Sequence, residues 1–265
     1  MHDTLSSLIE RAITGNQRPL EFYLREHSRL PGSRANLELA NDVSYLLAAS
    51  CSRRPDDVRS LLDYLICSDN KHVTGNTPAE FVMLCGLIAF GACAAVQVDW
   101  REETFDALNQ YACSPYWRIR EGVAIAYQHL LNADPKAAIA RLKDLASSGN
   151  YLQQRAAVAA IAEPPLLYNP DLLTAALELQ RIVLERMRNA PLTVRKNEDF
   201  RVLRRALGYT LSVITAAGPE QGFALMRECA SWGDPDITWI LRENLRKKRL
   251  AKFSQDTAVV SRLLP

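Results

Sequence analysis

The sequence lacks the signals of a β-sheet protein. No stretch alternates apolar and polar residues between tight turns, and the 11 glycines and 13 prolines fall mainly between segments of helical periodicity. A half-buried strand needs that alternation, whereas a helix needs apolar residues three or four positions apart. The sequence therefore predicts an all-α protein.

Recognisable metal and catalytic motifs are also absent. The four histidines are scattered, and the six cysteines (Cys51, Cys67, Cys85, Cys93, Cys113 and Cys229) form no CxxC pair and no cluster with histidine. Four donors must surround a zinc ion, so this spacing predicts no metal site and instead favours reduced, mostly buried thiols. No glycine-rich phosphate loop, paired-carboxylate motif or Ser/His/Asp arrangement is recognisable. We therefore predict no cofactor, and no enzyme class is favoured by a motif.

The N-terminal stretch has no basic start followed by an apolar run, so we expect no signal peptide and a cytoplasmic location. One apolar segment, 81–98, approaches the length of about 20 residues that spans a bilayer. It lies between Glu80 and Asp99 without a basic flank, and Gln97 interrupts it. Because a helix that is apolar on all sides can also be the centre of a helical stack, we predict a buried helix and no membrane association.

Charge is balanced overall but not along the chain. The sequence contains 32 Lys and Arg against 30 Asp and Glu, yet residues 181–252 contain 15 basic and 8 acidic side chains. That segment has a net charge of +7, and the remainder has −5. Such asymmetry is typical of a protein that offers one surface to an acidic partner.

Helical periodicity covers most of the chain, and Pro115, Pro135 and Pro219 stand at helix starts, where proline is tolerated. We expect helices near 3–14, 19–28, 34–52, 55–68, 77–96, 101–113, 116–131, 135–147, 150–162, 170–189, 197–216, 219–231 and 235–253.

Four of these stretches share a pattern. Each begins with a turn and has an arginine five or six residues later, at the start of an apolar helix: Ser114 and Arg120, Asn150 and Arg155, Asp199 and Arg205, Asp236 and Arg242. The arginines are 35, 50 and 37 residues apart, and the polar connection 189–199 accounts for the longer gap. Two helices in each such period indicate an α-solenoid, in which a unit buries its apolar face only against its neighbours.

The pattern has a physical reason. A turn carboxylate can accept hydrogen bonds from the backbone N–H groups at the start of a helix, and the guanidinium can reach a carboxylate or carbonyl of the next repeat. We therefore predict a right-handed α-α superhelix of about six helical pairs. It would form one continuous domain over 1–265, with less regular pairs in 1–100, recognisable repeats in 101–253 and a tail in 254–265. We expect a monomer or a weakly self-associating chain.

The stretches SPYWRIREGVAIAY and DPDITWILRENL resemble HEAT repeats, in particular the phycobilisome-lyase type, whose second helices begin with such a D…R pattern. The resemblance covers about 102–253 and implies a scaffold whose concave face holds a protein or peptide partner. The lyase chemistry of some relatives is not implied, because no chromophore-handling residue is identifiable.

A narrower resemblance is to the HEAT-like bacterial alkylpurine DNA glycosylases. These have a Trp followed four residues later by an Asp, an Arg in a later repeat, and a W-x-L-R-E helix. Here Trp117 precedes Glu121 by four residues, Arg155 follows, and WILRE begins at Trp239. The resemblance implies that Trp117 and Trp239 line a damaged base, that Glu121 replaces the catalytic Asp, and that Arg155 faces phosphate. Glutamate at position 121 moves the carboxylate by one methylene from the family's pattern.

Two basic stripes lie on the last predicted repeats. Successive residues of a helix are rotated by about 100°, so residues three or four positions apart share a face. The first stripe consists of Arg201, Arg204 and Arg205, and the second, on the next repeat, consists of Arg242, Arg246 and Arg249. Together they could bind nucleic-acid phosphates or an acidic peptide. The alternative is structural, since basic residues favour the C-terminal end of a helix and a terminal repeat needs a polar outer face.

Overall fold

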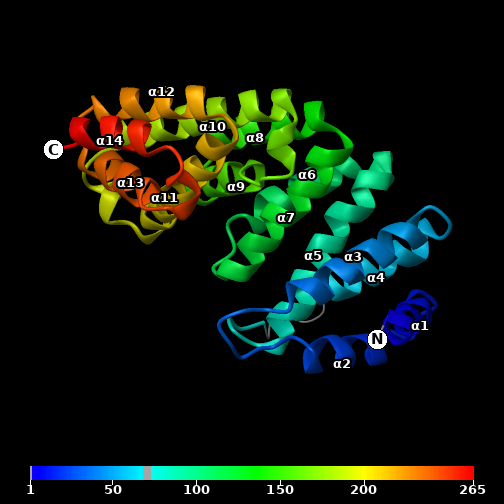
Figure 1. The fold of residues 1–265 in the computed structure, drawn as a ribbon. Coiled ribbons are helices and arrows are strands. Elements are labelled where there is room, and N and C mark those ends of the chain that lie inside the picture. Colours follow the sequence, from blue (N-terminus) through cyan, green and yellow to red (C-terminus); the bar gives the residue numbers. More distant parts are fainter. Residues whose placement is uncertain (1, 68–72) are drawn as a thin grey trace. The chain divides into compact units, whose positions relative to one another are not determined.

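The computed structural model describes residues 2–67 and 73–265, and within them the chain is helical, with no strand (Figure 1). The helices of the first half are α1 (His2–Ile13), α2 (Arg18–Glu26), α3 (Leu37–Cys51), α4 (Pro55–Cys67), α5 (Pro78–Val96), α6 (Arg101–Tyr111) and α7 (Trp117–Ala133). Those of the second half are α8 (Pro135–Ser148), α9 (Tyr151–Ile161), α10 (Pro170–Arg188), α11 (Glu198–Ala217), α12 (Pro219–Ala230), α13 (Pro235–Leu245) and α14 (Ser254–Leu263). The predicted all-α class is confirmed.

The chain divides into two compact units, 1–134 and 135–265. A solenoid also divides in this way, because each repeat contacts only its neighbours. The single continuous domain, the superhelix, its handedness and the number of pairs therefore stay predictions.

Helix α5 is the centre of the first unit. It packs against α3 and α7, and also against α4 and α2. Every residue from Glu80 to Ala94 is buried. Gly91 lets α5 and α7 approach closely, because a Cβ at this position would lie 2.6 Å from the Cα of Ala126. Helix α5 lacks an amphipathic pattern because neighbouring helices cover it on several sides.

By length and composition α5 could also cross a membrane, and among the described residues it is the one helix of which this is true. Its most apolar 18-residue window is 83% buried inside the protein. This agrees with the predicted buried helix.

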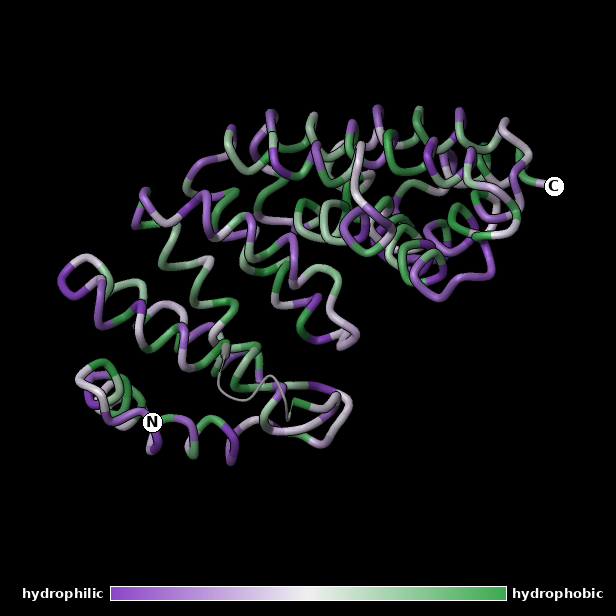
Figure 2. The backbone as a smooth tube through the Cα atoms, turned by 180° about the vertical axis from the view of Figure 1, so that it is seen from behind, coloured by the Kyte–Doolittle hydropathy of each residue, from purple (hydrophilic) through white to green (hydrophobic). Residues whose placement is uncertain are grey.

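The second unit has two layers. Helices α8, α10, α12 and α14 contact one another in order along one layer, and α9, α11 and α13 form the other (Figure 1). In Figure 2, the outer turns alternate between hydrophilic and hydrophobic, as amphipathic helices with one buried face do. Each helical pair packs on the next, which is the packing of a helical repeat.

Two expectations near the C-terminus were wrong. The helix expected over 235–253 ends at Leu245, and Lys247 has an extended backbone (φ −75°, ψ 128°). This change of direction lets Leu250, in the short turn η4 (Lys248–Leu250), become fully buried beside α11. The expected tail contains α14, which packs on α12 and buries Val260. The other expected helices are present within a few residues at each end, except that Ser68, the predicted end of 55–68, lies outside the described residues.

Candidate binding surfaces

The residues that the sequence singles out fall into two groups, one in each unit. Trp117 and Glu121 lie one turn apart on α7 of the first unit. Arg155 lies on α9 of the second unit, where α11 carries Arg201, Arg204 and Arg205, α13 carries Trp239 and Arg242, and Arg246 and Arg249 follow α13. We therefore describe two surfaces separately.

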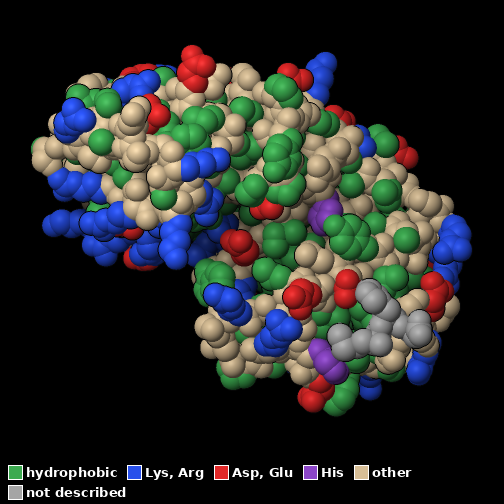
Figure 3. Space-filling view, in the orientation of Figure 1, with side chains coloured by type: hydrophobic (Ala, Val, Ile, Leu, Met, Phe, Trp, Pro, Cys, Tyr) green, Lys and Arg blue, Asp and Glu red, His purple; other side chains and the backbone are tan. Residues whose placement is uncertain are grey.

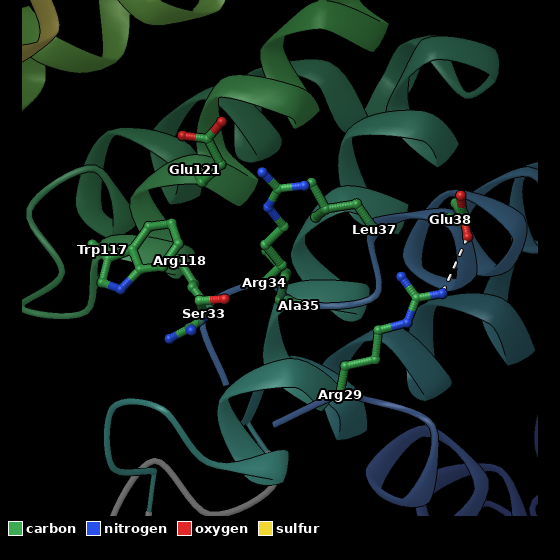
Figure 4. A pocket seen from close by; sticks show the side chains of 10 residues that line it. Arg29, Ser33, Arg34, Ala35, Leu37, Glu38, Trp117, Arg118 and Glu121 are labelled. Atoms are coloured by element: carbon green, nitrogen blue, oxygen red, sulfur yellow. Dashed lines mark hydrogen bonds and ion pairs between the residues drawn. The ribbon is translucent and has the colours of Figure 1, made fainter. Parts of the chain in front are cut away.

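In the first unit, Trp117 and Glu121 line a pocket of about 360 Å³ (Figure 4). Trp117 is 52% exposed and Leu37, at the start of α3, is 39% exposed. The lining consists of Arg29, Ser33, Arg34, Ala35, Leu37, Glu38, Leu84, Trp117, Arg118 and Glu121. The loop before α3 and the start of α7, distant in sequence, thus form one site.

Arg118 fixes the geometry of this pocket. Its buried guanidinium donates to the Glu80 carboxylate (3.3 Å) and to the Gly32 carbonyl (2.5 Å), and lies 4.4 Å from the centre of the Trp117 ring. The Asn76 backbone N–H donates to the same Glu80 oxygen at 2.7 Å. These bonds tie the loop before α3 to α5 and α7, so the pocket is formed before any ligand arrives.

The arginines of the pocket differ in their partners. Arg29 forms an exposed ion pair with Glu38 at 3.4 Å. Arg34 is exposed and has no ion-pair or hydrogen-bond partner in the described part of the chain. In Figure 4 its side chain extends between Trp117 and Leu37. The pocket thus combines an exposed apolar lining with the positive charge of Arg34, which pairs with no described residue.

In the second unit, the start of α13 is held by two carboxylates. Asp234 accepts from the backbone N–H groups of Asp236 (2.9 Å) and Ile237 (3.1 Å), as an N-cap residue does. Arg195 donates to Asp234 at 2.7 Å and to Asp236 at 3.0 Å, and its guanidinium also donates to carbonyls at the end of α10. Burial disfavours the charged guanidinium of Arg195, but these carboxylates outweigh it and raise its pKa.

The arginine of α11 that reaches the next repeat is Arg204, which donates to Asp236 at 2.5 Å. The pattern had pointed to Arg205, which is exposed and pairs with Glu198 of its own helix at 2.6 Å. One position on a helix is a rotation of about 100°, which turns Arg204 toward α13 and Arg205 toward solvent. The predicted bond between repeats exists, with a different donor.

Trp239 is part of the packing between α11 and α13. Its ring is half-buried, with the Arg204 guanidinium 4.5 Å from its centre. A Cβ on Gly208 would lie 3.2 Å from the edge of the same ring. Arg155, for its part, is 8% exposed and belongs to the interior of α9. The prediction that Trp117, Glu121, Arg155 and Trp239 form one site spans both units and stays a prediction.

Exposed cations lie on α11 and α13 and on the segment after α13. Figure 3 shows Lys and Arg side chains gathered over these helices. We define the basic surface by its exposed members: Arg201, Arg205, Arg242, Arg246, Lys248, Arg249 and Lys252. Arg205 pairs with Glu198 of its own helix, Arg246 pairs with Glu243 of α13, and Arg242 donates to the Pro265 carbonyl. Arg201, Lys248 and Arg249 have no ion-pair or hydrogen-bond partner among the described residues.

An apolar pocket of about 620 Å³ adjoins the basic surface. Arg249 and Lys252 line one part of it, and Tyr168, which is 88% exposed, lines another. The remaining lining is Pro164, Leu167, Val213, Ala216 and Ala217. A ligand on this surface would meet both cations and an apolar depression.

Sequence reasoning missed Arg34, Leu37 and Lys252 as binding candidates. Arg34 and Leu37 belong to the helix predicted over 34–52, but the helix begins at Leu37 and Arg34 lies in the loop before it. Nothing in the sequence shows that this loop meets α7. Lys252 was placed within the last helix, whereas the chain has already left the helix at that point.

The described residues show no cluster for a metal ion, and most of their thiols are buried. They contain no group of three or more His, Cys, Asp or Glu side chains that could hold a metal ion. Cys51, Cys85, Cys93 and Cys229 are buried free thiols and Cys113 is exposed, whereas the Cys67 side chain lies outside the described residues. Burial raises the pKa of Cys229 to about 12, so its thiol stays protonated at neutral pH.

No protein-family model matches the chain, and no curated protein matches it in sequence. The HEAT-like assignment therefore remains a prediction from the repeat pattern.

Proposed function

We propose that this chain is a non-enzymatic helical-repeat scaffold that binds an acidic protein segment on the basic surface of its second unit. The observation that carries the proposal is the set of exposed cations Arg201, Lys248 and Arg249, which lack acidic partners among the described residues. An acidic segment would supply the missing carboxylates. The layer of α9, α11 and α13 would be the concave face of the solenoid.

The adjoining pocket favours a protein over a nucleic acid. Its lining is largely aliphatic, with Leu167 and Val213 beside the exposed Tyr168. Apolar side chains of a peptide suit such a pocket, whereas a sugar-phosphate backbone has no group to bury there. Trp239 is already packed against Gly208 and Arg204, which leaves less of its ring for a base.

A nucleic acid is the second candidate. Unpaired cations on neighbouring elements also suit phosphates, and the second unit contains 20 Lys and Arg against 13 Asp and Glu. Under this alternative the chain would be a nucleic-acid-binding relative of the HEAT-like glycosylases, with or without activity in DNA alkylation repair.

Fluorescence anisotropy across a salt series can separate these proposals. The probes are a labelled peptide of Glu, Asp and Leu, the same peptide with Gln and Asn for its acids, and duplex and single-stranded DNA. We expect the acidic peptide to bind more tightly than the others. Binding should weaken with salt, since the contacts are exposed charges.

The matched variants remove four exposed positive charges each. Arg201, Lys248, Arg249 and Lys252→Ala removes them from the basic surface, and Arg11, Arg53, Lys136 and Arg262→Ala removes them elsewhere. We expect the first variant to bind the acidic peptide about tenfold more weakly, which is about 1.4 kcal/mol, and the second to change little. If both variants lose the same affinity for the acidic peptide, the effect follows from net charge alone, and the basic surface is not the binding site. Tighter binding of DNA than of the peptide would replace the first proposal by the second.

A further inference from the structure

The pocket of the first unit has an exposed apolar lining that the proposed function does not use. Trp117 and Leu37 come from α7 and α3, and the buried Leu84 of α5 also lines the pocket. Exposed large apolar side chains that converge on a depression are typical of binding sites. The lining therefore indicates a ligand with an apolar group.

The same pocket contains a positive charge without a partner in the described part of the chain. Arg34 has no ion pair or hydrogen bond with the described residues, whereas the neighbouring Arg29 pairs with Glu38 and Arg118 pairs with Glu80. The Arg34 side chain lies between Trp117 and Leu37 in Figure 4. An anionic group bound to Arg34 would thus place an attached apolar group against the indole.

The acidic residues around the pocket favour an anion with a single negative charge. Glu38 and Glu121 also line it. The first unit has 12 Lys and Arg against 17 Asp and Glu. A phosphate chain or another polyanion would be repelled by this surrounding, but a single carboxylate can form a planar two-point contact with one guanidinium.

The loop that carries Arg34 is held at both ends. Arg118 donates to the Gly32 carbonyl, and the Gly32 N–H donates to the Asn76 side chain at 3.1 Å. At the other end the Asn36 side chain donates to the His27 carbonyl at 2.9 Å and caps α3. A preformed site loses less conformational entropy when a ligand binds.

We propose that this pocket binds the C-terminal residue of a partner protein, with its carboxylate on Arg34 and an apolar side chain against Trp117, Leu37 and Leu84. A peptide C-terminus places one carboxylate next to one side chain, which is the combination that the pocket offers. The volume of about 360 Å³ suits a single residue better than a helix or an extended strand. This site belongs to the first unit, shares no residue with the basic surface, and does not depend on the proposed function.

The test uses the full chain and N-terminally labelled peptides that differ only at their C-terminus. One ends in Phe with a free carboxylate, one in Phe with an amide, and one in Ser with a free carboxylate. We expect the free Phe peptide to bind at least about tenfold more tightly than either of the others, because each of those lacks one of the two contacts.

Three variants assign the contacts. Arg34→Gln should weaken the free acid to the level of the amide and leave the amide unchanged, and Trp117→Ala should weaken both Phe peptides. Arg53→Gln removes another exposed arginine of the same unit, which also lacks a partner among the described residues, and should change nothing. Because Arg34 has no partner to lose among the described residues, its variant should unfold in urea like the wild type, which separates a lost contact from a lost fold.

Equal binding of the acid and the amide would overturn the proposal, and so would an equal effect of Arg34→Gln and Arg53→Gln. Phenylacetate or hexanoate binding as tightly as the Phe peptide would assign the pocket to small apolar acids instead of a protein C-terminus. Negative results with these peptides would not bear on the acidic-peptide experiment on the second unit, since that experiment uses other probes and variants.

Discussion

The two units use their arginines differently. The first unit has a net charge of −5 and pairs Arg118 with Glu80 in its interior, where the two side chains are 5% and 0% exposed. The second has a net charge of +7, and its pairs of Arg195 and Arg204 with Asp236 lie nearer the surface, with Arg204 31% exposed. An arginine that pairs with a carboxylate of another element stabilises the fold in both units.

The comparison separates structural arginines from binding candidates. Arg118, Arg195 and Arg204 each join two elements of their unit. Arg34 and Arg201 are exposed and make no such contact among the described residues. Position in the repeat does not distinguish the two classes, but the presence of a carboxylate from a neighbouring element does.

The largest expected effect tests this difference in burial. Glu80→Ala should lower the free energy of unfolding by about 3 kcal/mol, because it leaves the buried Arg118 guanidinium without its carboxylate. Asp236→Ala should cost only about 1 kcal/mol, since Arg204 can reach water and Arg195 keeps Asp234. Urea unfolding of both variants measures the difference.

The control for this prediction is the double variant Glu80→Ala/Arg118→Met. It removes both charges, so it should recover much of the stability that Glu80→Ala loses. If Asp236→Ala lowers the free energy of unfolding as much as Glu80→Ala does, the burial of an ion pair does not determine how much it stabilises its unit.

A smaller effect is expected where two helices approach each other at a glycine. A Cβ on Gly91 would lie 2.6 Å from backbone atoms of Ala126, whereas a Cβ on Gly208 would lie 3.2 Å from the end of the Trp239 ring. Gly91→Ala should therefore destabilise the protein by about 2 kcal/mol, since α5 and α7 must move apart.

Gly208→Ala is the matched substitution in the second unit. Both positions are inside helices, so alanine gains the same helix propensity of about 0.5–1 kcal/mol. At position 208 a half-buried side chain can shift, and the change should be close to zero. Thermal unfolding of the two variants compares them, and similar midpoints would contradict a tighter contact in the first unit.

The fold was largely predictable because its signal is local. Helices with one buried face repeat their apolar residues every three or four positions, and α5 was recognisable from its length and from flanks without basic residues. Helix α14 was missed because it buries only Val260 fully, so its apolar pattern is weak. The end of α13 depends on the burial of Leu250 beside α11, which is a tertiary contact.

The sites were less predictable because they depend on contacts between distant segments. The exposed cations after α13 follow from composition alone. The exchange of Arg204 for Arg205 depends on helix rotation, and the Arg118–Glu80 pair joins residues 38 positions apart. The approach of Arg34 to Trp117 depends on the loop before α3, where the sequence predicts the start of a helix.

The smallest expected effect concerns pH, and it should be confined to the first unit, which contains all four histidines. His129 of α7 lies edge-on to Tyr45 of α3, with ring centres 5.9 Å apart, and its buried Nε2 has no hydrogen-bond partner among the described residues. Burial lowers the pKa of His129 below its ordinary value of about 6.5. The unfolded chain then binds a proton at a higher pH than the folded one. Stability that is complete above about pH 6.5 should therefore be lost as the pH falls toward the folded pKa.

Hydrogen exchange at pH 7.5 and at about pH 5.5 would measure this effect by segment. Amides of α3 and α7 should lose protection on acidification, while those of α11 and α13 should keep it. His129→Leu should remove the difference between the two units, because its side chain cannot be protonated. An unchanged pH response in that variant would assign the effect to carboxylates, whose pairs in the second unit would then have to weaken as well.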